Sequence, residues 1–227
     1  ENSLLLLQEI LSMLLQDCQL HLRFRLVFPI SFLLFFLRHL PGFQFQILRL
    51  THLHHVNINI FILADALYFL LSFSRVRICI YGDYDADGIT ATSLMLHVLR
   101  YLVPPERVGY YIPSRFEEGY GLNREALGQI AERGYQAVIT VDCGSVSAAE
   151  VAYAKELGLA ILVTDHHTIT DRMADCLLVN PKRADSGYPF RELCGCGVAF
   201  KMAQLLQKRC GLPKHVLSEV LDLAAIG

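Results

Sequence analysis

From residue 77 onward, short apolar runs alternate with longer segments of helical periodicity, and this alternation constrains the fold more than any other feature. The apolar runs predict five strands, over residues 77–81, 108–112, 137–141, 160–163 and 176–179. The periodic segments predict helices over residues 89–102, 123–133, 147–157, 198–208 and 214–223. Strands that alternate with helices in this way form βαβ units, whose neighbouring strands run parallel. The sequence therefore predicts an α/β domain with a mainly parallel sheet and helices on both faces.

Residues 1–76 differ in composition from the rest of the chain. They contain no lysine, a single glycine and ten of the thirteen phenylalanines, with runs such as LLLL and FLLFFL. We therefore divide the chain into an atypical Leu/Phe-rich segment, residues 1–76, and a domain over residues 77–227. The segment is interpreted either as helical or as an out-of-frame or misassembled 5′ end of the coding sequence.

A membrane role for this segment is the less favoured interpretation. A spanning helix needs about 20 consecutive apolar residues. Residues 26–37 provide only a dozen and contain Pro29, and residues 56–73 are interrupted by polar side chains such as Asp65. A secretory signal would begin with a basic stretch and end at small residues, and neither is visible. Membrane association is therefore not expected.

Charge and cysteine content narrow the functional classes further. The formal net charge of −2 excludes a generally basic nucleic-acid coat, so nucleic-acid binding would need a local patch or metal ions. The seven cysteines include no CxxC pair, which indicates reduced thiols in a cytoplasmic protein. His52, His54 and His55 have no acids or cysteines nearby and make a weak metal-site candidate.

Acidic and histidine side chains follow three of the predicted strands directly. They are Asp83, Asp85 and Asp87 after the first strand, Asp142 after the third, and Asp165, His166 and His167 after the fourth. Ligand sites of open parallel sheets lie beyond the carboxyl ends of the strands, so these side chains are expected to meet at one edge. So many acidic groups cannot share an edge without a cation. Carboxylate oxygens with one or two imidazoles favour Mn²⁺, followed by Mg²⁺.

Several of these residues also have a structural explanation when taken alone. Asp83 fits a turn, Asp142 fits a cap for the helix near residue 147, and His166 fits a loop histidine with satisfied hydrogen bonds. Cys143 is expected to be a packing residue rather than a nucleophile, because no activating partner is near it in the sequence. A cation centre is favoured because the structural explanations would have to hold independently at three strand ends.

The ligand set predicts metal-assisted hydrolysis of a phosphoester without a covalent intermediate. Two cations that share a carboxylate activate a water molecule and clamp the phosphoryl oxygens. Asp142, which lies between the other ligands in the sequence, is the expected shared ligand. Asp85 would hold one ion, while Asp87 and His166 would hold the other.

Asp165 and His167 have an expected role other than metal binding. His167 would face the scissile phosphate, where it stabilises developing charge or protonates the leaving oxygen. Asp165 would orient a histidine through a hydrogen bond. Both are therefore predicted as catalytic residues rather than as metal ligands.

Seven segments together resemble one family and follow that family's order. They are YGDYDADGITAT (81–92), YYIPSRFEEGYGLN (110–123), ITVDCGS (139–145), VTDHH (163–167), VNPKR (179–183), GCGVAFK (195–201) and LDLAAIG (221–227). They resemble the DHH phosphoesterase superfamily and, within it, the RecJ-like exonucleases specific for single-stranded DNA. The resemblance implies a cytoplasmic, Mn²⁺- or Mg²⁺-dependent 5′→3′ exonuclease of DNA recombination and repair. Its implied partners are single-stranded DNA and other recombination and repair proteins.

The resemblance also implies a metal role for individual residues. The family's metal motifs match this chain at Asp85, Asp87, Asp142 and residues 165–167. Tyr81 stands where related enzymes often place a histidine ligand, so Asp83 becomes an additional candidate ligand.

Substrate-binding residues are expected in two of the matching segments. Arg115 could pair with a phosphate through its planar guanidinium, or form a surface salt bridge with one of the glutamates that follow it. Tyr120 could stack on a base or serve in packing. Lys182 and Arg183 are weaker phosphate candidates.

The chain departs from the family pattern at its C-terminal end. Similar proteins continue past the segment that matches LDLAAIG into a further metal-binding aspartate, a second domain and an oligonucleotide-binding module. This chain ends at Gly227, so it is expected to be a catalytic-domain fragment with impaired activity.

Two other functions stay open. One is a DHH phosphodiesterase for cyclic dinucleotides or short oligonucleotides, although those relatives usually have HxxPDxD where this chain has YGDYDADG. The other is a non-catalytic scaffold at replication forks, which would not need the acids at the three strand ends.

Overall fold

The computed structural model describes residues 76–170 and 172–227. The interpretations of the N-terminal segment as helical, membrane-associated or not genuine coding sequence concern residues that lie outside this range. The same holds for the histidine cluster at residues 52–55. The proposed boundary between the two parts of the chain therefore stays a prediction.

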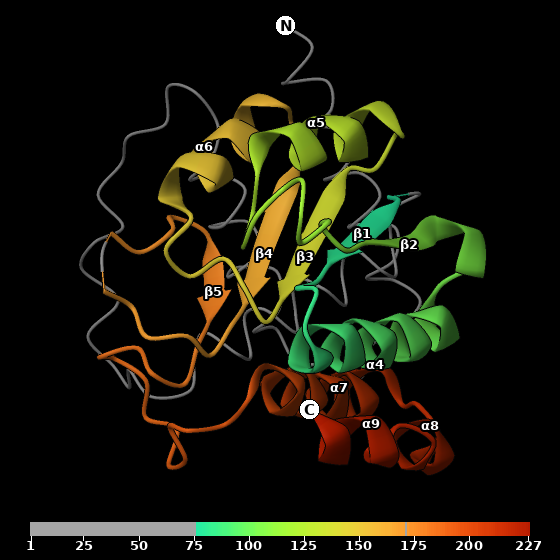
Figure 1. Ribbon diagram of the computed structural model, residues 1–227. Coiled ribbons are helices and arrows are strands. Elements are labelled where there is room, and N and C mark those ends of the chain that lie inside the picture. Colours follow the sequence, from blue (N-terminus) through green and yellow to red (C-terminus); the bar gives the residue numbers. More distant parts are fainter. Residues whose placement is uncertain (1–75, 171) are drawn as a thin grey trace, which may run out of the picture. The chain divides into compact units, whose positions relative to one another are not determined.

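Five parallel strands form one sheet (Figure 1). They are β1 (Ile78–Tyr81), β2 (Val108–Tyr111), β3 (Ala137–Val141), β4 (Ala160–Thr164) and β5 (Leu177–Val179). Their order across the sheet is β2-β1-β3-β4-β5, and each neighbouring pair runs parallel. The parallel sheet predicted from the alternation is therefore confirmed, with strand bounds that differ by no more than one residue.

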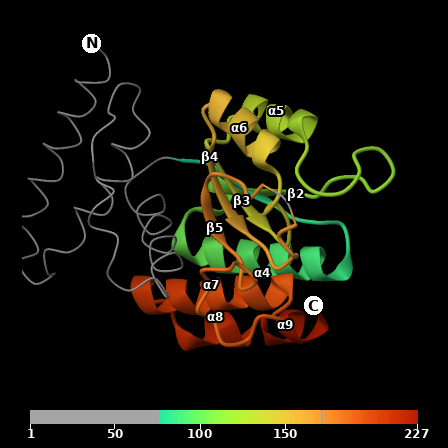
Figure 2. The same ribbon diagram turned by 90° about the vertical axis from the view of Figure 1, so that its left-hand side faces the viewer.

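Helices cover both faces of the sheet. They are α4 (Ala86–Leu102), α5 (Arg124–Glu132), α6 (Ala148–Glu156), α7 (Gly195–Cys210), α8 (Lys214–Ser218) and α9 (Leu221–Ile226), with a 3₁₀ turn η1 (Pro105–Arg107) before β2. Figures 1 and 2 show α5 and α6 on one face and α4 with α7 on the other, where α8 and α9 pack beside them. The three-layer arrangement agrees with the predicted fold class.

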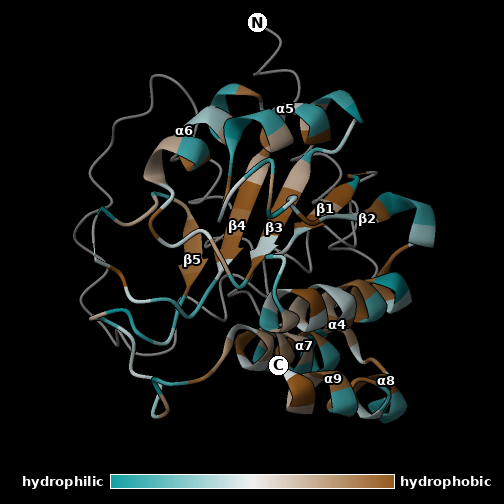
Figure 3. Ribbon diagram, viewed as in Figure 1, coloured by the Kyte–Doolittle hydropathy of each residue, from teal (hydrophilic) through white to brown (hydrophobic). Residues whose placement is uncertain are grey.

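Each face of the sheet has its own apolar core, because successive residues of a strand point to opposite sides. In β1, Ile78 and Ile80 pack with α4 and α7, whereas Cys79 and Tyr81 pack with α5 and α6. Strands buried on both faces are mostly apolar, and Figure 3 shows β4 and β5 largely in brown. A shift of register by one residue would exchange the two cores, so the strand ends are fixed in position.

Two helix starts depend on polar caps. The side chain of Asp85 accepts a 2.9 Å hydrogen bond from the N–H of Gly88, so α4 begins at Ala86, three residues before the predicted start. Asp87 therefore lies inside the first turn of α4. Asn123 caps α5 through a 2.7 Å hydrogen bond from the N–H of Ala126.

The expectation of one helix over residues 214–223 is wrong. The chain instead forms α8 and α9, and Val220 between them leaves the helical region with a φ of −121°. This change of direction lets the side chain of Val220 enter the core on the α4 side.

Within residues 76–170 and 172–227, no helix combines the length and the apolar character needed to cross a bilayer.

Packing between α4, α7 and the sheet is testable at Leu94, whose side chain is fully buried in this core. Leu94→Ala is expected to lower the free energy of unfolding by about 3 kcal/mol, because it removes buried methyl groups and leaves a cavity. Ser93→Ala, on the exposed side of the same helix, should change it by less than about 0.5 kcal/mol. Urea unfolding of the full chain measures both; equal losses would contradict the assigned core.

Candidate metal centre

The acid and histidine groups predicted from the sequence meet beyond the carboxyl ends of β1, β3 and β4. The chain proceeds from β1 to β2 on one side, and later to β3 on the other side of β1. In open parallel sheets such a reversal of strand order leaves a crevice that serves as a ligand site. Asp83 and Asp85 follow β1, Asp142 follows β3, and residues 165–167 follow β4.

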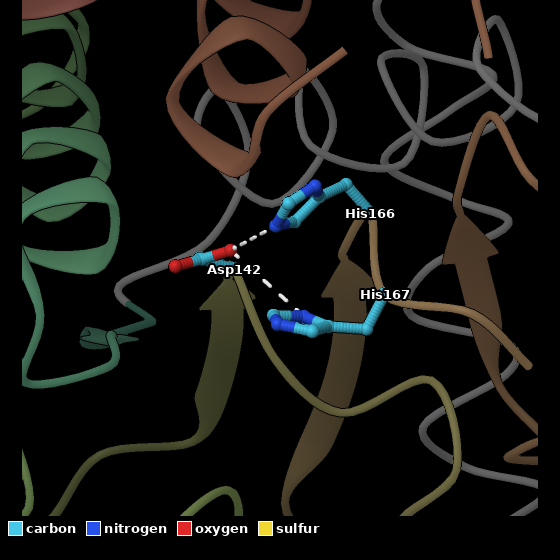
Figure 4. A group of neighbouring side chains, drawn as sticks. All are labelled: Asp142, His166 and His167. Atoms are coloured by element: carbon cyan, nitrogen blue, oxygen red, sulfur yellow. Dashed lines mark ion pairs between the residues drawn. The ribbon is translucent and has the colours of Figure 1, made fainter. Parts of the chain in front are cut away.

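Asp142 lies at the centre of this group, with only 1% of the residue exposed (Figure 4). Its Oδ1 lies 3.0 Å from Nε2 of His166 and 4.0 Å from Nδ1 of His167. Among the described residues, neither carboxylate oxygen has a hydrogen-bond partner of good geometry. The backbone of Asp142 is left-handed, with a φ of 63°. Such strain is typical of functional sites.

The environment of Asp142 disfavours its ionised form. Burial raises the pKa of Asp142 to about 6, and the negative charges of Asp87 and Asp85 act in the same direction. The nearby imidazole of His166 opposes this shift without cancelling it. A cation would stabilise the ionised form of a buried carboxylate that its neighbours compensate only in part. The expectation that Asp142 caps a helix is wrong, because the residue that precedes α6 is Ser147.

Two groups of side chains could hold a metal ion, and Asp142 belongs to both. One consists of Asp142, His166 and His167, and the other of Asp83, Asp85 and Asp142; within each, the ligand atoms lie within 4.8 Å of one another. Carboxylate and imidazole donors suit Mn²⁺ or Mg²⁺, so the residues present fit such ions. Oδ1 of Asp83 also accepts a 2.7 Å hydrogen bond from the N–H of Tyr84, and its expected turn role stays a prediction.

Asp87 is held differently from the other acids. Its two oxygens accept hydrogen bonds of 2.7 Å and 2.6 Å from the N–H groups of Gly195 and Cys196, at the start of α7. Negative charge is favoured at this end of a helix. Asp87 Oδ2 also lies 3.5 Å from Nε2 of His166. The carboxylate therefore joins α4, α7 and His166, which keeps it a candidate ligand beside the two groups above.

His167 and Asp165 form a hydrogen-bonded pair. Asp165 Oδ1 lies 2.8 Å from Nδ1 of His167, and its Oδ2 accepts a 2.8 Å hydrogen bond from the N–H of Ser145. Burial alone would raise the pKa of Asp165, but the hydrogen bonds from His167 and Ser145 outweigh it and lower the pKa below its usual range. The hydrogen bond to Asp165 in turn raises the pKa of His167. This arrangement is the one expected for a carboxylate that orients a histidine.

Three supporting residues were missed by the sequence analysis. The buried amide of Asn180 donates 2.9 Å hydrogen bonds to the hydroxyl of Ser145 and to the carbonyl of His167. Gly195 approaches Asp142 so closely that an added Cβ would overlap the carboxylate. All three lie in segments that match the family, but no local pattern singles out a residue that acts through a backbone contact.

The two stronger substrate candidates lie near the centre. The hydroxyl of Tyr120 is 3.0 Å from Nε2 of His167, and half of the tyrosine is exposed. Arg115 forms no ion pair with any described residue; its guanidinium lies over the ring of Tyr84, 5.5 Å from the centroid. The salt bridge between Arg115 and a neighbouring glutamate is therefore not formed.

The two weaker candidates have structural partners. Arg183 makes hydrogen bonds of 2.8 Å and 2.7 Å to Asp185 and one of 2.9 Å to the carbonyl of Leu178. Lys182 Nζ lies 3.4 Å from Glu192. Phosphate binding by these two residues stays a prediction that these contacts do not favour.

Tyr81 and Cys143 serve in packing. The hydroxyl of Tyr81 donates a 2.9 Å hydrogen bond to the carbonyl of Gly121, and the residue is fully buried. Cys143 is also buried, and burial raises its pKa well above the usual value for a thiol. A thiol in this state is a poor nucleophile, in agreement with the packing role expected from the sequence.

The fold and the site define a class of protein: a parallel α/β domain with an acid–histidine centre suited to divalent cations at its switch point. Residues 77–227 match the N-terminal domain of the DHH family, and the chain belongs to that family. The signature from which the family takes its name is the sequence of residues 165–167.

The chain is similar to proteins named single-stranded-DNA-specific exonuclease RecJ. It is 51% identical to that of Bacillus subtilis (strain 168) over 152 residues, which are 66% of this chain and 18% of the relative. It is 39% identical to that of Escherichia coli (strain K12) over 163 residues, 66% of this chain and 28% of the relative. The chain thus spans less than a third of the length of these relatives.

Solved structures support the fold assignment. The crystal structure of an exonuclease RecJ bound to manganese matches with a TM-score of 0.64 and 36% identity, over 74% of this chain and 41% of that chain. RecJ of Thermus thermophilus in complex with Mn²⁺ matches with a TM-score of 0.60 and 32% identity, over 74% of this chain and 23% of that chain. Both relatives are described as holding Mn²⁺.

The raised pKa of Asp142 predicts opposite effects of one substitution on stability and on metal binding. The folded carboxyl has a pKa of about 6, above its ordinary value of 3.8. The folded state therefore holds the proton more tightly, and stability falls as the pH rises between these values, by at most about 3 kcal/mol. Asp142→Asn removes this titration while keeping the shape and tolerating the left-handed backbone.

In EDTA, the Asp142→Asn variant should melt at a higher temperature than the original chain at pH 8, and the difference should shrink towards pH 4. In Mn²⁺ the order should reverse, because only the original chain gains binding energy from the ion. Thermal unfolding at four pH values measures both. A difference in EDTA that stays constant from pH 4 to pH 8 would contradict the assigned titration.

The close approach of Gly195 to Asp142 gives a second prediction. Gly195→Ala is expected to displace the Asp142 carboxylate and weaken Mn²⁺ binding by at least about tenfold, measured by Mn²⁺ electron paramagnetic resonance. Gly128→Ala in α5 is the control: its Cβ meets nothing within 4 Å, so it should leave Mn²⁺ binding unchanged. That variant should also stabilise the helix by about 0.5–1 kcal/mol. Unchanged Mn²⁺ affinity in both variants would refute the assigned contact.

Proposed function

We propose that this chain is a catalytic domain for metal-dependent hydrolysis of phosphodiester bonds, acting on single-stranded DNA as a 5′→3′ exonuclease. The observation that carries this proposal is the buried Asp142 carboxylate, which belongs both to a group with two histidines and to a group of three aspartates. The similarity to RecJ proteins, at up to 51% identity over the same domain, supports the substrate. Two Mn²⁺ or Mg²⁺ ions are the proposed cofactors.

The proposed ligands are those that the centre brings together. Asp83, Asp85 and Asp142 would hold one ion, and Asp142 with His166 the other, with Asp87 beside them. When bound, divalent cations supply Lewis-acid chemistry: they polarise phosphoryl oxygens and favour ionisation of water. Asp87 is oriented by the two N–H groups of α7, which fix its carboxylate beside His166.

His167 is the proposed proton donor of the reaction. Its Nδ1 is bound to Asp165, so its Nε2 is the atom left to face a substrate, where it now contacts the hydroxyl of Tyr120. The raised pKa of His167 increases the fraction that carries a proton near neutral pH. A protonated Nε2 could donate to the leaving oxygen or stabilise charge on the phosphate. His167 also belongs to one of the two metal-holding groups, so a ligand role is the competing assignment.

Arg115 and Tyr120 are the proposed substrate contacts. An arginine without an acidic partner retains all its donors for a phosphate, and an exposed tyrosine beside the centre offers a face on which a base can stack. We propose that the protein works in the cytoplasm beside other recombination and repair proteins. The six cysteines in the described part of the chain are free, which agrees with a reducing compartment.

The test is Mn²⁺-dependent degradation of single-stranded DNA labelled at either end. A 5′→3′ exonuclease should release labelled mononucleotides from 5′-labelled DNA and produce a ladder from 3′-labelled DNA. Asp142→Ala should lower the rate by about 100-fold or more, because it removes the shared ligand. Glu106→Ala is the matched control. Glu106 is an exposed acid that precedes β2, so it lies at the amino ends of the strands, opposite the metal centre.

The other outcomes separate the competing functions. Cleavage of cyclic dinucleotides but not of DNA strands would favour the small-substrate phosphodiesterase. Absence of Mn²⁺ binding would favour the non-catalytic scaffold. Mn²⁺ binding without release of any product from DNA or dinucleotides would contradict the hydrolytic chemistry proposed for the centre.

A further inference from the structure

The segment between β2 and α5, residues 112–122, carries both proposed substrate contacts. The ring of Tyr120 meets the ring of His167 edge to face, with centroids 5.6 Å apart. Arg115 lies over Tyr84, a residue between two of the acids that follow β1. Both side chains are exposed, so they are held beside the metal centre only as long as the backbone of the segment keeps its conformation.

One side chain ties this segment together. Oε1 of Glu118 accepts a 2.8 Å hydrogen bond from the N–H of Ser114. Its Oε2 accepts hydrogen bonds of 2.6 Å from the hydroxyl of Tyr111, at the end of β2, and 3.2 Å from the amide of Asn123, the cap of α5. These hydrogen bonds outweigh burial and lower the pKa of Glu118, so the carboxylate is ionised. The half-buried Glu118 therefore connects the strand before the segment, the segment itself and the helix after it.

The preceding glutamate has no such role. Glu117 is exposed, and its side chain has no hydrogen bond or ion pair with any described residue. The two acids are adjacent in the sequence and of the same type, but only Glu118 binds the segment through its side chain. Their comparison separates the effect of charge from the effect of position.

We infer that Glu118 is a positioning residue for the substrate: its carboxylate holds the segment that places Arg115 and Tyr120 at the metal centre. This inference rests on the proposed function. Glu118 makes no hydrogen bond or ion pair with the described acids and histidines of the centre, so its contacts act on the centre through the segment. All of its hydrogen-bond partners are donors, which an ionised carboxylate can satisfy at once and a neutral amide cannot.

The charge of Glu118 and its position predict opposite effects of Glu118→Gln on the binding of single-stranded DNA. Removal of a negative charge near a polyanion favours binding through long-range electrostatics. Loss of the hydrogen bonds to the Glu118 carboxylate weakens DNA binding, because the N–H₂ group of the introduced glutamine faces a donor and the segment loosens. We expect the second effect to dominate, with a KM for single-stranded DNA raised about five- to tenfold, which corresponds to the net contribution of one ordinary hydrogen bond. Glu117→Gln should leave the KM unchanged or lower it.

The experiment measures kcat and KM of the full chain with Mn²⁺ on two substrates, single-stranded DNA and bis(p-nitrophenyl) phosphate. The small diester has no base to stack and only one phosphate, so its kcat should change by less than about twofold in Glu118→Gln. Tyr111→Phe removes one donor to the Glu118 carboxylate at a position outside the segment. It should raise the KM for DNA in the same way. Mn²⁺ affinity should be the same in all three variants.

Hydrogen–deuterium exchange of residues 112–122 in EDTA gives a readout that does not depend on activity. Exchange should be faster in Glu118→Gln and Tyr111→Phe than in the original chain, and unchanged in Glu117→Gln. Equal losses on both substrates, or an unchanged KM for DNA together with unchanged exchange, would overturn the inference. If the original chain cleaves neither substrate, the proposed function fails instead, and the exchange rates still decide whether Glu118 holds the segment.

Discussion

A buried carboxylate whose charge is only partly compensated is the constraint on which the rest of this domain depends. Asp142 leaves the end of β3 with a left-handed backbone and is almost completely excluded from solvent. Burial of an uncompensated charge costs several kcal/mol, and the carboxylates of Asp85 and Asp87 increase that cost. The nearby imidazole of His166 compensates only part of it. A divalent cation would compensate all three acids together, so the local instability is better explained as a ligand-binding site than as a defect of folding.

The layers around this carboxylate hold its neighbours in place. Asp87 lies in the first turn of α4, yet both of its oxygens are bound by the start of α7. The packing of these two helices in one core is therefore also the positioning of a candidate ligand. Gly195 completes this arrangement, because a side chain there would occupy the space of the Asp142 carboxylate. A substitution that moves α7 relative to α4 would disturb the centre without altering any of its acids or histidines.

The fold and the main candidates of the site were predictable because both follow from local patterns. Apolar runs mark the strands, and the acids stand directly after them, so the topology of parallel strands brings Asp142 and residues 165–167 together. The supporting contacts were not predictable. Ser145 acts through its backbone N–H and Asn180 through a carbonyl of a residue 13 positions away, and neither leaves a pattern in the sequence. The break between α8 and α9 was not predicted from the sequence either, because it depends on the burial of Val220 in a core built by distant segments.

The two adjacent histidines show how environment, rather than residue type, divides the tasks of the centre. Their rings lie 4.5 Å apart and are inclined by 61°, so they face different partners. His166 approaches Asp142 and Asp87, whereas His167 is bound to Asp165. A metal ligand must present an unprotonated nitrogen, while a proton donor must keep its proton near neutral pH. The ionised carboxylate of Asp165 favours the protonated form of His167, whereas it accepts a 2.7 Å hydrogen bond from the backbone N–H of His166. The order Asp-His-His therefore lets one carboxylate favour a proton on His167 while the imidazole of His166 faces Asp142 and Asp87, so that metal binding and proton transfer can be joined at a single strand end.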